Sequence, residues 1–166
     1  MLAERNAIKG KEYRDEVFKW LTDNTHLTVY PQEITIKRKG FFVADTDKGD
    51  IDILAIDHER KIIYLIECKN TSQSKVAYEF HIEIIEYLGQ LGKVGLIQKH
   101  VNRDLWLLEN RKQVLEKLKV DSDYGILSLV ISNHVLPTAF LRTIPIATIS
   151  FYELKQSGLP VSGYDR

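Results

Sequence analysis

The sequence predicts a single α/β domain, and three observations support this class. The chain has 166 residues, of which 44% are hydrophobic, and this size and composition suit one compact domain with its own core. Apolar residues recur at helical spacing in some segments and form short runs of strand length in others. No internal repeat or low-complexity tract interrupts these segments. We therefore expect one domain over residues 1–156, followed by a loosely packed tail over 157–166 that is rich in Gly, Pro and Ser.

The chain begins with a helical pattern and continues with a strand pattern. Apolar residues at helical spacing predict a helix over residues 11–21. Pro31 then interrupts the chain. Alternation at Ile34 and Ile36, followed by the apolar run over 41–43, indicates a strand with a turn or bulge.

Two stronger strand patterns follow, over residues 50–57 and 61–69, and the polar residues between them indicate a turn. Together they predict a hairpin. Both strands are apolar on both faces until their charged ends, which is typical of central strands that are covered on two sides. Because residues two apart on a strand point to the same face, Glu67 and Lys69 should project together from a strand end.

The second half of the chain alternates between helix and strand patterns. The segment 78–91 fits both strand alternation and one helical face, and we favour a helix. A long amphipathic pattern predicts a helix over 101–118. Apolar runs over 126–131 and 144–149 predict two more buried strands, and a short helix is expected over 151–156.

The pairing of the two hairpin strands predicts a pair of opposed carboxylates. Asp50 and Asp52 share one face of the first strand. If the turn contains an even number of residues, antiparallel pairing places Asp52 opposite Glu67 and Asp50 opposite Lys69, whereas an odd turn shifts this register by one residue. Directly opposed residues have Cβ atoms about 4.5 to 5.5 Å apart, and two carboxylates at that distance repel unless a proton or a cation lies between them. We therefore expect a divalent metal ion at this point.

The overall composition excludes several other classes of protein. Acidic and basic residues balance at 23 each, so a nucleic-acid partner would have to be held by a local patch of positive charge. Cys68 is the only cysteine, and no Cys/His cluster has the spacing of a structural zinc site. No stretch has the apolar length of a membrane span or of a signal-peptide core. We expect a soluble cytoplasmic protein with no membrane partner.

The segment 49–55, with the sequence GDIDILA, and the segment 64–69, with the sequence YLIECK, resemble the core of the PD-(D/E)XK nuclease superfamily. That superfamily includes restriction endonucleases and Holliday-junction resolvases. The resemblance implies a restriction-endonuclease-like fold, with a mixed central β-sheet flanked by α-helices. It also implies that Asp52 and Glu67 bind a metal ion and that Lys69 is catalytic.

The resemblance implies further metal ligands and also has limits. The backbone carbonyl of Cys68 would add an oxygen ligand, and an acidic residue of the first helix often joins the metal shell. Glu16 is the first choice for that residue and Glu12 the second. Mg²⁺ or Mn²⁺ suits such oxygen donors. Ile51 stands where the family pattern has proline, and the glutamine-and-tyrosine helix motif of the RecB-like exonuclease branch is missing after Lys69.

We therefore expect a divalent-metal-dependent endonuclease that acts on DNA in preference to RNA. Three alternatives stay open: an RNA nuclease, a nucleic-acid-binding or partner-docking module without activity, and a cleavage module of a larger restriction, anti-phage or repair assembly. A homo-oligomer is also compatible with the sequence. Several basic residues lie in segments near the motif and are expected to contact phosphates, namely Lys48, Lys75, Lys93, Lys99 and Arg103.

Overall fold

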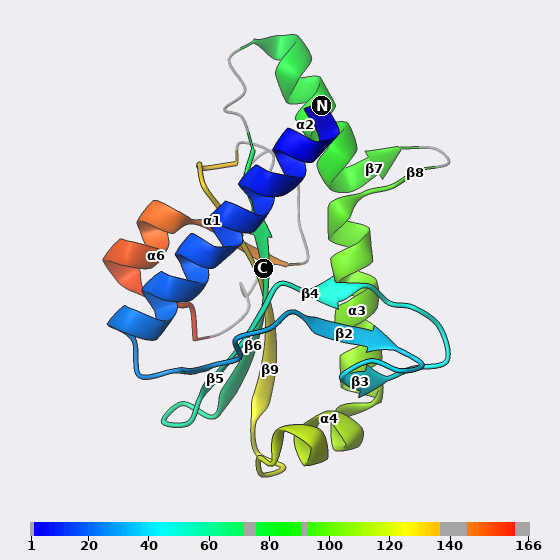
Figure 1. The fold of residues 1–166 in the computed structure, drawn as a ribbon, viewed down its shortest axis with the longest axis vertical. Coiled ribbons are helices and arrows are strands. Elements are labelled where there is room, and N and C mark those ends of the chain that lie inside the picture. The colour runs from blue at the N-terminus through cyan, green and yellow to red at the C-terminus, as the bar shows by residue number, and fades with distance from the viewer. Residues whose placement is uncertain (1, 72–75, 91–92, 137–145, 162–166) are drawn as a thin grey trace.

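The computed structural model describes residues 2–71, 76–90, 93–136 and 146–161, and it shows a mixed α/β architecture (Figure 1). The elements follow one another in the order α1 (Leu2–Asn24), β1 (Thr28–Val29), β2 (Ile34–Lys37), β3 (Phe42–Val43), β4 (Asp50–Ile51), β5 (Ile53–Asp57), β6 (Ile62–Lys69), α2 (Ala77–Leu88), β7 (Gly89–Gln90), β8 (Lys93–Val94), α3 (Leu96–Glu109), α4 (Arg111–Leu118), β9 (Gly125–Ser132), β10 (Ala147–Ser150) and α6 (Phe151–Ser157).

The main sheet is mixed, as the family resemblance implies. Within the described residues its strand order is β1-β5-β6-β9-β10. Strands β1, β5 and β6 pair antiparallel, whereas β6, β9 and β10 pair parallel. A smaller sheet has the order β3-β2-β4, and β7 pairs with β8. The long strand β6 therefore lies at the centre of the main sheet.

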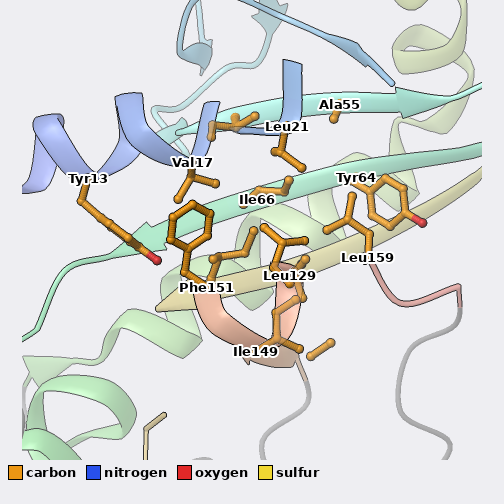
Figure 2. Close-up of a cluster of buried hydrophobic side chains, with 14 residues drawn as sticks. Tyr13, Val17, Leu21, Ala55, Tyr64, Ile66, Leu129, Ile149, Phe151 and Leu159 are labelled. Carbon is orange, nitrogen blue, oxygen red and sulfur yellow. The ribbon is translucent and has the colours of Figure 1, made fainter. Parts of the chain in front are cut away.

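Helices α1 and α6 cover one face of the main sheet (Figure 2). Val17 and Leu21 of α1 pack with Phe151 of α6 against Ile66 of β6, and these side chains are buried. Tyr13 and Trp20 contact the Phe151 ring edge to face. The apolar residues at helical spacing in α1 therefore form the face of the helix that is buried on the sheet.

The smaller sheet and helices α3 and α4 cover the opposite face. Leu54 and Leu65 of the main sheet pack there with Ile36 of β2, Leu107 of α3 and Val114 of α4. Strands β5 and β6 are thus buried on both faces, which explains their apolar runs. The prediction that they are central strands is confirmed.

Several element boundaries differ from the sequence expectations. The first helix extends well beyond 11–21, and the helix predicted over 101–118 is divided at Asn110 into α3 and α4. The helix predicted over 78–91 is confirmed by α2 as far as Leu88, whereas Gly89–Gln90 form β7 and residue 91 lies outside the described residues. The strand over 126–131 and the short helix from Phe151 are confirmed. The last predicted strand begins at Ala147, and its residues 144–145 lie outside the described residues.

The start of the C-terminal segment is anchored rather than loosely packed. Leu159 is buried in the core beneath α1 and α6, and the Tyr64 hydroxyl donates a hydrogen bond of 2.9 Å to the carbonyl of Pro160. The expectation of a loose tail from residue 157 therefore does not hold for these residues, because an apolar side chain of the segment completes the core. No described helix combines the length and the apolar character that crossing a bilayer requires.

Candidate functional site

The candidate site lies at the end of the β5–β6 ladder that is far from the hairpin turn. The turn between β5 and β6 contains four residues, 58–61, and the ladder pairs Asp57 with Ile62 and ends at Ile53 with Ile66. This is the predicted register, and it is confirmed as far as Ile53, the residue after Asp52. The predicted ladder pair of Asp52 with Glu67 is not formed. Asp52 itself forms a bend between β4 and β5.

Beyond this bend the chain joins the smaller sheet. Asp50 pairs with Thr35 of β2, and Ile51 pairs with Ile34. The predicted ladder pair of Asp50 with Lys69 is not formed, because β4 pairs with β2 instead. Asp52 thus lies at the junction of the two sheets.

Two arginines from opposite sides hold the backbone of this junction. Arg14 of α1 donates from Nε to the Asp52 carbonyl at 3.0 Å, and Arg103 of α3 donates from Nη1 to the Asp50 carbonyl. Gly49 has a φ of +84°, a conformation that favours glycine, and its Cα faces the Arg103 side chain. Helices α1 and α3 therefore fix the position of the bend.

The bend directs the Asp52 carboxylate toward the last residues of β6. Oδ2 accepts a hydrogen bond of 2.7 Å from the Cys68 backbone N–H, which lies beyond the last ladder pair. Burial, followed by the negative charge of Glu67, raises the pKa of Asp52 to about 7, although the Cys68 hydrogen bond opposes this change. The two carboxylates are therefore close enough to repel each other, as the hairpin pairing predicts.

Glu67 is paired with a buried arginine. Its Oε2 accepts a hydrogen bond of 2.6 Å from Nη2 of Arg103, and the two side chains are only 16% and 9% exposed. Arg103 also contacts Nδ1 of His100 at 2.9 Å. A guanidinium therefore supplies the positive charge beside Glu67.

Lys69 is the last residue of β6 and is half-buried. It pairs with Ser132 of β9, and its carbonyl accepts a hydrogen bond of 3.2 Å from the Asn133 N–H. By strand alternation its side chain leaves the sheet on the same face as Glu67. The strand end thus carries a carboxylate and an ammonium group on one face.

Cys68 and the acidic residues of α1 differ in burial: the Cys68 side chain packs in the core, whereas Glu12 and Glu16 are exposed. The Cys68 side chain packs against the core beneath α1, and burial raises the pKa of its thiol. Only the backbone atoms of Cys68 can therefore take part in the site. Glu12 and Glu16 are exposed on α1, and the charge of Glu16 contributes to the raised pKa of Tyr13.

Glu33 is an acidic residue of the site that the sequence analysis missed. It precedes β2, lies 4.0 Å from Nε of Arg14, and its charge contributes to the raised pKa of Asp52. Glu33 is exposed, so it could reach a ligand at the bend. No local pattern marks Glu33, because it reaches the bend only through the pairing of β2 with β4.

The basic residues expected to contact phosphates do not share one environment. Lys48 is half-buried just before β4, whereas Lys99 is exposed on α3. Arg103, which was expected to contact phosphates, is buried inside the site, because Glu67 and the Asp50 carbonyl hold it there. Lys93 belongs to β8, and Lys75 lies outside the described residues.

The donor atoms at the bend suit a hard cation. Within the described part of the chain no three His, Cys, Asp or Glu side chains gather in a metal-binding cluster, so a metal ion would need backbone or solvent oxygens as well. Asp52 and Glu67 nevertheless bring two carboxylates together, and the positive charge of Arg103 lowers the pKa of Asp52. The site therefore already favours positive charge, and its oxygen donors fit Mg²⁺ or Mn²⁺.

The raised pKa of Asp52 leads to a prediction about stability. The unfolded chain should release the Asp52 proton near pH 3.8, whereas the folded protein keeps it until about pH 7. The free energy of unfolding should therefore fall as the pH rises from about 4 to about 7, by up to about 1.4 kcal/mol for each unit. Asp52→Asn should lack this fall. Urea unfolding of both proteins in chelator across this range measures the difference, and parallel curves would contradict the assignment.

Comparisons with protein-family models, with curated proteins and with solved structures found no match. The site itself is therefore the basis on which a function can be inferred. Its features are a bent strand junction, two adjacent carboxylates, a lysine on the same strand end and a buried arginine.

Proposed function

We propose that this protein is a divalent-metal-dependent endonuclease with a restriction-endonuclease-like fold, and that it hydrolyses phosphodiester bonds of DNA. The bend at Asp52 is the observation that carries the proposal. It interrupts a buried strand and places the Asp52 carboxylate on the Cys68 N–H, next to Glu67 and at the end of the strand that carries Lys69. An interruption of this kind costs ladder hydrogen bonds, so a functional reason for it is expected.

The arrangement of the elements supports the same proposal. A helix, α1, precedes the antiparallel pair β5 and β6, and the parallel strand β9 follows after further helices. The resemblance seen in the sequence implies this order, with a mixed sheet and helices on both sides. The acidic residues would then lie where the central strand meets the junction of the two sheets.

Asp52, Glu67 and the carbonyl of Cys68 would hold Mg²⁺ or Mn²⁺ in this proposal. Such an ion, when bound, supplies Lewis-acid chemistry that activates water and offsets the charge developing on the phosphate. The Lys69 ammonium would hold the attacking water or stabilise the extra negative charge as the new P–O bond forms and the ester P–O bond breaks. Arg14 would keep the Asp52 backbone in place throughout.

A cleavage assay with four substrates tests this proposal. Supercoiled plasmid should be nicked or linearised with Mg²⁺ or Mn²⁺ and should stay intact with EDTA, because the reaction requires the ion at Asp52 and Glu67. Linear duplex, single-stranded DNA and RNA, each under the same three conditions, define the substrate. Gel electrophoresis with fluorescent size standards gives the readout.

The outcomes separate the alternatives. Cleavage of RNA alone would replace DNA by RNA as the substrate. Binding of nucleic acid without any cleavage would favour a docking module or a cleavage module that needs the partners of a defence or repair assembly. Cutting by the wild-type protein in EDTA would overturn the proposal.

A further inference from the structure

The guanidinium of Arg103 makes three polar contacts inside the site. Its guanidinium donates to Oε2 of Glu67 at 2.6 Å, contacts Nδ1 of His100 at 2.9 Å and donates to the carbonyl of Asp50. The residue is only 7% exposed, although it lies on α3, 36 positions along the chain from Glu67. A buried cation thus sits directly on one of the two proposed metal ligands.

The polar cluster around this cation is incomplete. Among the described residues, the buried Nε of Arg103 and the buried Nε2 of His100 have no hydrogen-bond partner. Burial, followed by the charge of Arg103, lowers the pKa of His100 to about 3, so His100 is neutral and its Nδ1 accepts from the guanidinium. A purely structural ion pair is usually stabilised by complete hydrogen bonding. Arg103 is instead held by Glu67, His100 and one carbonyl through its two Nη atoms, while its Nε has no partner among the described residues.

We propose that Arg103 is the resident cation of the metal-free site, and that a divalent ion must displace its guanidinium from Glu67 in order to bind. This inference depends on the proposed metal site at Asp52 and Glu67. A guanidinium on Oε2 of Glu67 and a divalent cation on the same carboxylate repel each other strongly in a partly buried site, so binding of the ion favours release of the guanidinium. Metal affinity is therefore set partly by the strength of the bond between Arg103 and Glu67.

Calorimetric titration with Mn²⁺ tests this competition. Arg103→Gln should bind Mn²⁺ about tenfold more tightly than the wild type, because it removes the competing charge and keeps a hydrogen-bonding side chain. Arg103→Lys, which keeps the charge but loses the two-pronged donor, should lie between the two. The rise in melting temperature caused by Mn²⁺ should also be larger for Arg103→Gln than for the wild type.

Two other arginines provide matched controls. Arg14→Gln removes the other support of the bend without touching Glu67, and it should leave Mn²⁺ affinity unchanged or weaker. Arg111→Gln removes a helical arginine that is bonded to the carbonyls of Ser122 and Tyr124, and it should leave affinity unchanged. Tighter binding in Arg14→Gln as large as in Arg103→Gln would mean that a loosened bend is the cause, and would overturn the inference.

A measurement on the wild-type protein covers the case in which Arg103→Gln fails to fold. The NMR signal of the Arg103 Nε–H should shift when diamagnetic Mg²⁺ is added, because the guanidinium leaves Glu67. An unchanged signal at saturating Mg²⁺ would overturn the inference, as would equal Mn²⁺ affinity in wild type and Arg103→Gln, including the case in which neither binds. Tighter binding in Arg103→Gln without any cleavage of nucleic acid would support the competition and contradict the proposal that this protein cleaves nucleic acid by itself. Metal-dependent cleavage together with equal Mn²⁺ affinity in wild type and Arg103→Gln would support the nuclease proposal and overturn the competition.

Discussion

Asp52→Asn and Glu67→Gln should each reduce metal-dependent cleavage by about a thousandfold or more, while the fold persists. A metal ion supplies several kcal/mol of transition-state stabilisation, and each 1.36 kcal/mol corresponds to a factor of ten in rate. Asparagine keeps an oxygen that can accept from the Cys68 N–H, so Asp52→Asn removes the charge and retains the bend. Because the carboxylates repel each other, the stability of metal-free Asp52→Asn at pH 7 should stay equal or rise. Glu67→Gln should instead be less stable, because it leaves the buried Arg103 without its counter-ion.

Single-turnover cleavage of plasmid with Mg²⁺, together with thermal unfolding in EDTA, measures both effects. Asp57→Asn is the matched control, since Asp57 is a buried carboxylate at the other end of β5. Its Oδ1 accepts from the N–H groups of Glu59 and Arg60 in the hairpin turn, away from the bend. This control should keep cleavage and lose some stability. Full activity in Asp52→Asn or Glu67→Gln would exclude the proposed site.

Lys69→Ala should lose turnover by about a hundredfold or more and still bind metal. A positioned proton-transfer group contributes typically 10²–10⁴-fold in rate, and stabilisation of developing charge contributes on a similar scale. An ammonium group is not a metal ligand, so its removal lowers the local positive charge and should leave Mn²⁺ affinity equal or tighter. Single-turnover rates at saturating Mn²⁺ and calorimetric titration separate the two quantities.

Lys61→Ala is the matched control for this variant. Lys61 lies at the opposite end of the same strand, in the hairpin turn, where it pairs with Asp123. Its replacement should change neither the cleavage rate nor the metal affinity. Loss of Mn²⁺ binding in Lys69→Ala would show that Lys69 supports the structure of the site, and unchanged turnover would remove it from the mechanism.

Local patterns in the sequence determined the central part of the fold. Strand alternation places Glu67 and Lys69 on one face of β6, and the even turn sets the register between β5 and β6. Both features depend on residues that are near one another in the chain, where backbone geometry allows few solutions. Apolar runs on both faces of these strands likewise predicted that helices or other elements cover the sheet on two sides.

Tertiary structure alone decided how the site is completed. The bend at Asp52 arises because β4 pairs with β2. The apolar alternation within residues 50–57 does not predict this pairing. The positions of Glu33 and Arg103 depend on that pairing and on the packing of α3 over the sheet. An arginine at helical spacing looks the same in sequence whether it faces solvent or a carboxylate 36 residues away, because the energy that fixes it comes from burial and charge in the assembled core.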